Sequence, residues 1–496
     1  MAPPLRPHEA SLALTAKSLS DFFFVPKREV TDLFSCSCVD RTMASRFKNI
    51  DRDTPLLLPP DLRDWVAEDD LVHFVIAAVE RLPLSRFKVN PKGCGDEQYP
   101  PHMLLALLVY CYANGIFSSR RIERATYRDV AVRYLCADTH PDHDTICAFR
   151  RQNFDAFAAA FVEVLEMAHE MKLLKLGCVS IDGTQIKASA SKDKNVTYAR
   201  ATQLRQQLQL EVKELLQQAE QADQKDQDPQ QLPKELARRQ QLLEKMEAAC
   251  AKLEERAKAR AQQEKAEYER KLAAREERGG GGPAPKPPAE TPESDEQINL
   301  TDADAHLMRK NAREGYTQSY NAQAVVDADG TQLIVGQRVS TCVSDANHLL
   351  PNLQAIPASL GTPTAALADC GFRNRVVFEQ LSRQPGAPEL YVSVHREDAH
   401  AERRYDYRPP EKRTPTRKIT HPVLLAMAAK LKTEQGRALY RRRACTVEPV
   451  FGVIKQALGF RQFLLRGLNK VTAEWNLVCL AYNLKRLHTL RPTPTA

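Results

Sequence analysis

The sequence places three acidic residues where carboxylates from distant segments can meet. Asp182 ends a short apolar run over residues 176–182, Asp369 follows another over 364–368, and Glu448 stands in a basic, helical segment. Carboxylate oxygens are hard ligands that suit Mg²⁺ or Mn²⁺. Two such ions about 3.5–4 Å apart can activate an attacking oxygen and stabilise a leaving one in phosphodiester chemistry. We predict that the three acids bind two ions, although each taken singly is more simply a turn residue or helix cap.

Other acids compete for these roles. Asp345 is the main rival for the second acid, but it starts an expected helix over residues 345–356, where it is more simply a cap. We expect Asp302 and Asp304 to lie in a loop and not to bind metal. Asp327 and Asp329 belong to the turn of an expected hairpin. None of these displaces the predicted set of three.

The residues around Glu448 predict its geometry. Pro449 lacks an N–H and is not tolerated deep inside a helix, so we expect the helix to restart there with Thr446 as its N-cap. Glu448 would then lie in the first turn, where the helix dipole favours the ionised carboxylate. Lys455 lies two turns later on the same face, where it can contact a DNA phosphate beside the metal ions.

Positive charge gathers in the last part of the chain. The net charge is +8, and residues 437–486 contain ten Lys or Arg against the two acids Glu448 and Glu474, so this window alone carries an excess of that size. Aromatic and apolar residues are interleaved with the charges. That pattern favours a phosphate-contacting surface over a merely solvated helical face. Arg461 and Arg466 join Lys455 as candidate DNA contacts.

Strand-like and helical segments surround the acids in a definite order. Strands are expected at residues 176–182, 319–326, 332–340, 364–368 and 390–394, and helices at 345–356, 373–382 and, with breaks, 437–487. The order is β, β, β, α, β, α, β, α. Two of the acids therefore end strands, and the third lies on a helix. This arrangement allows three carboxylates from distant parts of the sequence to meet.

The N-terminal part is predicted to be helical over about residues 60–175. Pro100-Pro101 opens one helix, Ser118 can cap the next, and Asp144 can cap another that continues to about Leu165. The helix after Ser118 carries several arginines on its outer face: Arg120, Arg121, Arg124, Arg128 and Arg133. Short helices with exposed arginines indicate a DNA-binding domain of helix-turn-helix character, and a plain helical bundle is the alternative.

Residues 199–277 have a different composition, dominated by Gln, Glu, Lys, Ala and Arg with sparse apolar positions. We predict two long helices in a coiled-coil hairpin, broken near Pro229 and Pro233 and followed by a flexible linker over residues 279–288. We predict four parts of the chain: a disordered extension (1–42), a helical N-terminal DNA-binding domain (43–170), a catalytic domain (171–198 plus 300–490) and the insertion (199–299).

Composition excludes several classes of protein. At 43% hydrophobic and 27% charged residues, the chain can bury large cores. It has no run of 18 apolar residues for a membrane helix and no secretory signal pattern. Its twelve cysteines stand mostly singly in apolar segments, which suits free thiols in a reducing cytosol. We therefore expect a cytoplasmic protein without a membrane partner.

The chain resembles DDE-type insertion-sequence transposases, whose catalytic domain has a ribonuclease H-like fold. The resemblance covers roughly residues 45–490 and rests on Ser180-Ile181-Asp182-Gly183-Thr184, Ala368-Asp369-Cys370-Gly371-Phe372 and a Tyr-Arg-Glu-Lys signature at Tyr440, Arg443, Glu448 and Lys455. Matching segments also occur at residues 315–316, 320–323 and 140–145. One spacing departs from the family pattern, because Arg443 precedes Glu448 by five residues rather than four. Either the expected break near Pro449 absorbs the shift, or Arg441 substitutes.

This resemblance implies an α/β ribonuclease H-like core with an all-α DNA-binding domain before it. Asp182, Asp369 and Glu448 would bind the metal ions, and Tyr440, Arg443, Lys455, Arg461 and Arg466 would contact DNA. The implied function is a DNA transposase that cleaves insertion-element ends and joins the 3′-OH to target DNA. Its partners would be the terminal inverted repeats, target DNA and at least one further copy of the chain, with nucleoid association when DNA is bound. The alternatives are a nuclease without strand transfer and a non-catalytic repressor.

Overall fold

The computed structural model describes residues 61–88, 98–224, 232–277, 284–309, 314–394 and 419–491. The expected extension over residues 1–42, Pro229 and the glycine run of the expected linker lie outside the described residues. No helix within these ranges is long and apolar enough to cross a membrane.

Helices follow one another through the described part of residues 61–170. They are α1 (Leu62–Trp65), α2 (Leu71–Glu80), α3 (Pro101–Ala113), α4 (Ser119–Arg128), α5 (Val130–Leu135), α6 (His143–Gln152) and α7 (Phe154–Glu170). The predicted start at Pro101 is confirmed. The predicted cap at Asp144 is wrong, because Asp142 accepts the hydrogen bond from the Thr145 N–H at 2.6 Å.

Two further helix boundaries differ from the prediction. Asn153 separates α6 from α7, where one continuous helix was expected. Arg133 does not belong to the arginine-bearing helix, because α4 ends at Arg128 and Asp129 caps the next helix by accepting from the Val132 N–H at 3.0 Å. The outer face of α4 therefore carries four of the five predicted arginines.

A mixed sheet forms the centre of the C-terminal part. Its strands are β1 (Cys178–Lys187), β4 (His306–Met308), β5 (Thr317–Asp327), β6 (Ile334–Ser340), β7 (Ala365–Ala368) and β8 (Glu389–Val392). β5 pairs antiparallel with β1, β4 and β6, whereas β7 runs parallel to both β1 and β8. The five predicted strands occur in the predicted order, β4 is a further strand that was not predicted, and the described chain is a mixed α/β structure.

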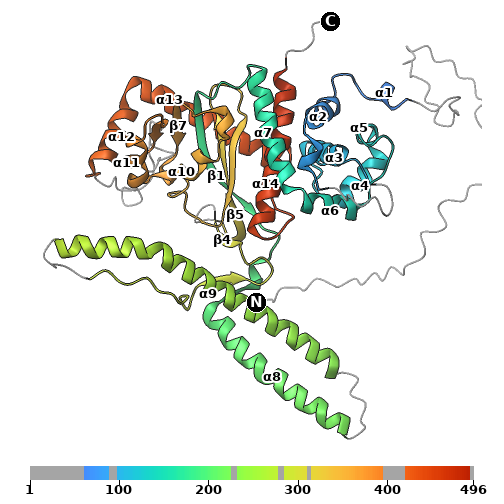
Figure 1. The fold of residues 1–496 in the computed structure, drawn as a ribbon, viewed down its shortest axis with the longest axis vertical. Helices are drawn as coiled ribbons and strands as arrows, with labels where there is room; N and C mark the ends of the chain where they lie inside the picture. The colour runs from blue at the N-terminus through green and yellow to red at the C-terminus, as the bar shows by residue number, and fades with distance from the viewer. Residues whose placement is uncertain are drawn as a thin grey trace, which may run out of the picture. The chain divides into compact units, whose positions relative to one another are not determined.

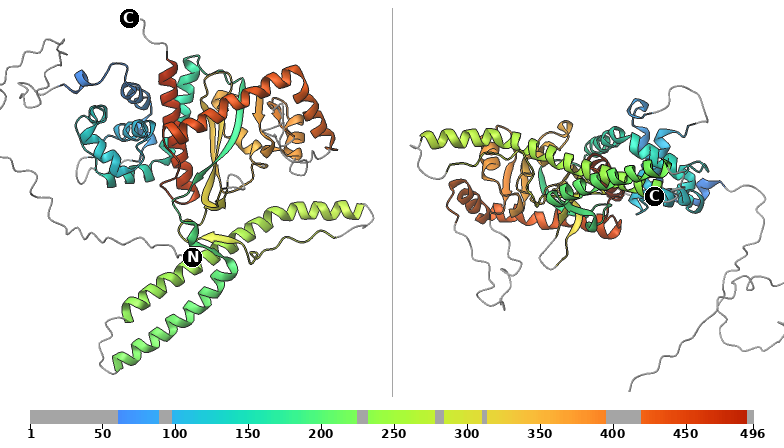
Figure 2. Two further views of the ribbon diagram at one scale, coloured as in Figure 1. Left: turned by 180° about the vertical axis from the view of Figure 1, so that it is seen from behind. Right: turned by 90° about the horizontal axis from the view of Figure 1, so that it is seen from below.

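Helices cover this sheet and join it to the N-terminal helices. They are α10 (Leu349–Gln354), α11 (Arg375–Arg383), α12 (Pro422–Lys432), α13 (Glu434–Gly452), the π-helical turn η6 (Val453–Ala457) and α14 (Leu468–Leu490). α13 crosses the sheet and contacts β1, β5, β7 and β8 (Figure 2). α14 lies beside α7 and contacts both α3 and β6, so it packs between the N-terminal helices and the sheet (Figure 1).

The expected helix restart at Pro449 is wrong, because α13 runs through this residue without a break. A proline inside a helix leaves the carbonyl four residues earlier without its usual donor. Here that carbonyl belongs to Cys445, and the side chain of Gln332 donates to it at 2.9 Å. Thr446 is not a cap either, since its hydroxyl donates to the Arg442 carbonyl at 2.6 Å. A residue from the β5–β6 turn thus supplies the hydrogen bond that the proline removes.

A buried polar network connects the N-terminal helices to α14. Arg150 donates to the Tyr112 hydroxyl at 2.9 Å, and that hydroxyl donates to Glu474 at 3.4 Å. The other oxygen of Glu474 accepts from the backbone N–H groups of Leu464 and Leu465, each at 3.0 Å. Arg150 and Glu474 are both almost fully buried, and one hydrophobic cluster extends across the same boundary. The helices and the sheet therefore pack as one body.

A helical hairpin departs from the sheet between β1 and β5, which are themselves neighbours. It consists of α8 (Tyr198–Gln224) and α9 (Leu232–Glu277), and a short antiparallel pair, β2 (Asn195–Thr197) and β3 (Gln297–Asn299), closes its base. Buried contacts between α8 and α9 come from Ala201, Leu208, Met246 and Cys250. Because α9 is the longer helix, it continues past the start of α8 (Figure 1).

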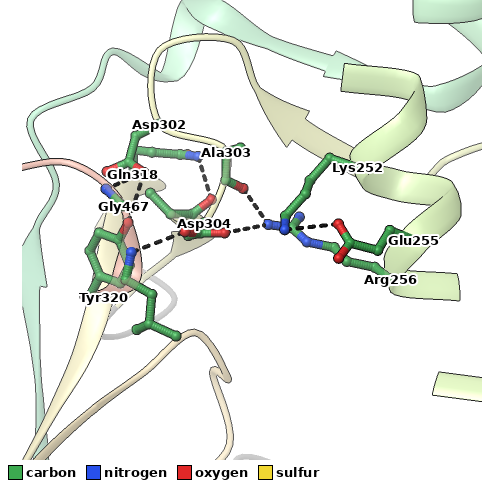
Figure 3. Close-up of polar contacts among 11 residues, drawn as sticks. Lys252, Glu255, Arg256, Asp302, Ala303, Asp304, Gln318, Tyr320 and Gly467 are labelled. Atoms are coloured by element: carbon green, nitrogen blue, oxygen red, sulfur yellow. Dashed lines mark hydrogen bonds and ion pairs between the residues drawn. The ribbon is translucent and has the colours of Figure 1, made fainter. Parts of the chain in front are cut away.

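The loop after β3 fixes this hairpin to the sheet (Figure 3). Asp302 accepts from the Tyr320 hydroxyl at 2.8 Å and from the Gly467 N–H at 3.1 Å. Asp304 accepts from the Leu468 N–H at 3.0 Å and pairs with Arg256 of α9 at 3.2 Å. The two acids lie in a loop, as predicted, but they also satisfy N–H groups at the start of α14. One loop therefore connects α9, β5 and α14.

Candidate active site

The register of the sheet brings Asp182 and Asp369 together. Ile181 of β1 pairs with Ala368 of β7 in parallel, so the two acids are the next residues on neighbouring strands. Asp369 follows β7 directly and accepts from the Gly371 N–H at 2.9 Å. Asp182 was predicted to end its strand, but it lies in the middle of β1, which continues to Lys187. The two carboxylates still meet, because β7 is the strand that ends here.

The electrostatics of Asp182 reflect this crowding. Burial, followed by the negative charge of Asp369, raises the pKa of Asp182 to about 7. The Gly183 N–H and Arg443 act in the opposite direction, and Asp345 adds a smaller upward shift of the pKa. Two partly buried carboxylates side by side favour the neutral form of one of them unless a cation compensates their charge.

Arg443 connects Asp182 with Glu448. Its guanidinium nitrogens lie 3.9 Å from Asp182 Oδ2 and 3.4 Å from Glu448 Oε1. Arg443 is buried at this site. Arg441, the predicted substitute, instead lines a pocket of about 710 Å³ together with Lys175. The five-residue spacing therefore still brings Arg443 to both acids, and no break in α13 is needed to absorb the shift.

Glu448 lies at a different point of its helix than predicted. It belongs to the last turns of α13, four residues before Gly452, rather than to a first turn. The predicted effect of the helix dipole on its carboxylate therefore does not apply, because that effect is limited to the first turn of a helix. Its side chain is 56% exposed, which leaves it open to solvent on the side away from Arg443.

The predicted DNA-binding residues lie around the second half of β1. Lys455, in η6, donates to Thr184 Oγ1 at 2.5 Å and to the Gln185 carbonyl at 2.9 Å. Arg461 donates to the Lys455 carbonyl at 3.0 Å, and Arg466 donates to the Ser189 carbonyl at 2.8 Å. The structure therefore brings these three cations beside the strand that carries Asp182, each with a partner within the chain.

Tyr440 takes a position apart from those cations. Its side chain packs with a small buried cluster on the sheet, and the Arg443 guanidinium lies 5.9 Å from its ring centre. The ring therefore supports the arginine that contacts Asp182 and Glu448.

The sequence interpretation missed the contribution of Asp345. Asp345 is not a helix cap, because α10 starts at Leu349 after His348. Its Oδ1 instead accepts from Asn321 at 2.8 Å and from Gln323 at 2.7 Å, both on β5. A signal for this was present, since amide side chains at alternate positions of a buried strand point to one face and need a partner there.

The donor set fits a divalent cation by its chemistry. Carboxylate oxygens are the ligands that Mg²⁺ and Mn²⁺ prefer, and the crowded charge at Asp182 and Asp369 favours a cation. Within the described residues, however, no three or more acidic, histidine or cysteine side chains are grouped closely enough to hold a metal ion. Arg443 is the group that contacts both Asp182 and Glu448 in this structure.

Comparison with known proteins gives two matches to family models. One is "Transposase domain (DUF772)", which matches residues 60–152, and the other is "Transposase DDE domain", which matches residues 405–488. No curated protein and no solved structure matches the chain. The first match covers the helices α1 to α6, and the second covers the segment that carries Arg443, Glu448 and Lys455. Both matched segments are therefore similar to transposase domains, which supports the expected resemblance to DDE-type insertion-sequence transposases.

Proposed function

We propose that this protein is an active transposase that cleaves the ends of an insertion element and joins the freed 3′-OH to target DNA. Asp182, Asp369 and Glu448 are the proposed catalytic residues. The observation that carries the proposal is the meeting of Asp182 and Asp369 on neighbouring parallel strands, with Arg443 reaching from Asp182 to Glu448. Residues separated by more than 180 positions in the sequence thus converge at one end of β7.

The topology supports a ribonuclease H-like core. β6, β5 and β1 form an antiparallel unit that β7 and β8 extend in parallel. The first acid stands on the central strand β1 and the second follows its parallel neighbour β7. In this arrangement the catalytic domain comprises residues 171–198 and 300–490, and the hairpin within 199–299 is an insertion between neighbouring strands.

Two Mg²⁺ or Mn²⁺ ions are the proposed cofactors, with Asp182, Asp369 and Glu448 as ligands. When bound, they would activate the attacking oxygen and stabilise the leaving one. The side chains of this chain have separate duties in that site. Asp182 and Asp369 present adjacent oxygens, Glu448 presents an exposed one, and Arg443 balances the charge of the two acids that it contacts.

The exposed face of α4 supports DNA binding by residues 43–170. Ile122, Ala125 and Thr126 face the interior, whereas the opposite face carries exposed basic side chains, Arg120, Arg121, Arg124 and Arg128, with Tyr127 between them. In the described part of the chain, none of these arginines forms an ion pair or a side-chain hydrogen bond. Unpaired arginines on one helix face fit DNA phosphates, which supply most of the affinity in such interfaces.

The proposed partners are therefore the inverted repeats at the element ends and the target DNA. Lys455, Arg461 and Arg466 would hold the DNA strand near the acids. Tyr440 and Arg443, the other two predicted DNA contacts, lie on α13. Strand transfer needs two ends, so we propose a homodimer or larger assembly on DNA, to which the hairpin α8–α9 would contribute helix pairing as a coiled coil. The proposed place of action is the cytoplasm, on the nucleoid.

A strand-transfer assay tests this function. Paired element ends are incubated with a supercoiled plasmid and Mg²⁺, and joined products are separated from simple nicks. Joined products are the expected result. Metal-dependent nicks without joining would indicate a nuclease on the same fold, and end binding without nicks would indicate a repressor derived from a transposase.

A further inference from the structure

We propose that Asp345 is a positioning residue of the active site, which holds the backbone beside the two catalytic aspartates and strengthens cation binding through its charge. The inference rests on the proposed function, since it concerns the same site. Its evidence comes from β5 and from two glycines, Gly183 and Gly371, that follow the catalytic residues closely in the sequence.

Two amides of β5 hold Asp345 through one of its oxygens. Oδ1 accepts from Asn321 Nδ2 and from Gln323 Nε2, at 2.8 and 2.7 Å. Gln323 is fixed in turn, because its Oε1 accepts from Asn352 at 2.8 Å and its amide also donates to Asn321 at 2.9 Å. Asn321 and Gln323 are both buried. The orientation of the Asp345 carboxylate is therefore set by a network of amides rather than by its own loop.

Asp345 packs against the glycine that follows Asp182. A Cβ atom at Gly183 would lie 2.8 Å from Asp345 Oδ1 and would also collide with the amide of Gln323. Gly183 pairs with Gln323 across β1 and β5. Gln323, Asn321 and Asp345 together therefore occupy the space that a side chain at residue 183 would fill, which places the Asp345 carboxylate beside the residue that follows the first catalytic acid.

The same carboxylate reaches the second acid. A Cβ at Gly371 would lie 3.0 Å from Asp369 Oδ1 and 3.6 Å from Asp345 Oδ2. Both carboxylate oxygens therefore lie near the same point beside Gly371. The amides hold Oδ1, and Oδ2 is turned toward the Asp369 loop. The negative charge of Asp345 also acts on Asp182. Asp345 thus stands beside both catalytic aspartates, and a cation held there is attracted by its charge.

Asp345→Asn tests this role with the full chain. Asparagine keeps the Oδ1 acceptor for the two amides, removes the charge and replaces Oδ2 by an amide donor toward Asp369, so the melting temperature without metal should not fall. Isothermal titration with Mn²⁺ in the absence of DNA should show an affinity at least about tenfold lower than that of wild type, the size of effect seen when an outer-shell partner is lost. In a cleavage assay kcat should fall while KM for end DNA stays unchanged.

Asp182→Asn separates this inference from the proposed function. If wild type binds Mn²⁺, Asp182→Asn does not, and Asp345→Asn binds like wild type, only the role of Asp345 is overturned. If wild type and Asp182→Asn bind Mn²⁺ equally, the proposed catalytic site itself is overturned. Should Asp345→Asn fail to fold, Asn321→Ala removes one donor and keeps the carboxylate. A weaker Mn²⁺ affinity then supports the role of Asp345, and an unchanged affinity overturns it.

Discussion

Asp182→Asn is expected to stabilise the metal-free protein at pH 8. Burial and the charge of Asp369 raise the pKa of Asp182 to about 7, from an ordinary value of 3.8 that the carboxyl regains on unfolding. A carboxyl with a raised pKa holds its proton more tightly in the folded state, so stability is lost as the pH rises from about 4 to 7. At 1.36 kcal/mol per pKa unit, ionised Asp182 lowers the free energy of unfolding by about 4 kcal/mol at pH 8.

Asparagine removes this cost and keeps the hydrogen bond from the Gly183 N–H, which the Asp182 Oδ1 accepts at 2.8 Å. For a unit the size of Asp61–Ala496, an unfolding entropy of about 2.1 cal/mol/K per residue converts this into roughly 4–5 °C of Tm. Calorimetry in EDTA should show that gain at pH 8 and about a third of it at pH 5. Equal Tm values for wild type and variant at pH 8, or the same gain at both pH values, would show that a raised pKa of Asp182 does not destabilise the folded protein.

Three further predictions concern DNA binding, the hairpin and the glycine beside Asp182. Replacing Arg120 and Arg124 by alanine should weaken end binding and reduce the slope of log affinity against log salt by about two units, measured by isotherms over a salt series. Replacing residues 198–296 by Asn-Gly should leave cooperative unfolding intact in calorimetry, whereas extending the deletion through Asn299, a buried amide that bonds to two backbone N–H groups, should lower Tm. Gly183→Ala should abolish cleavage in a nicking assay and leave end binding intact, because its methyl group would collide with the Gln323 amide and so displace the Asp345 carboxylate that this amide holds.

Much of the core could be predicted from local patterns. Short apolar runs bounded by turn residues gave the correct order of strands, and the acids after two of those runs pointed to Asp182 and Asp369. The two acids meet because Ile181 and Ala368 pair in parallel directly before them, although only β7 ends at this point. The position of Asp182 within β1 was missed, since the strand continues through the more polar residues 182–187.

The errors around the candidate site involve partners that are distant in the sequence. Pro449 breaks a helix by local rules, but Gln332 from another element supplies the missing donor, and α13 continues. Arg443 looked misplaced by one residue, yet an unbroken helix brings it to Asp182 and Glu448. Asp345 looked like a cap, because its amide partners Asn321 and Gln323 lie on a strand more than 20 residues earlier. Local sequence can indicate that such side chains need a partner, but it does not show which distant residue supplies the hydrogen bond.

The most direct test of the account is a cleavage and strand-transfer assay on paired element ends, run with Asp182→Asn, Asp369→Asn and Glu448→Gln beside wild type. We expect each variant to lose both reactions and still bind end DNA as tightly as wild type, since the carboxylates serve the chemistry and the arginines and lysines serve phosphate binding. Wild-type cleavage by Asp369→Asn or by Glu448→Gln would contradict the account and remove that residue from the active site.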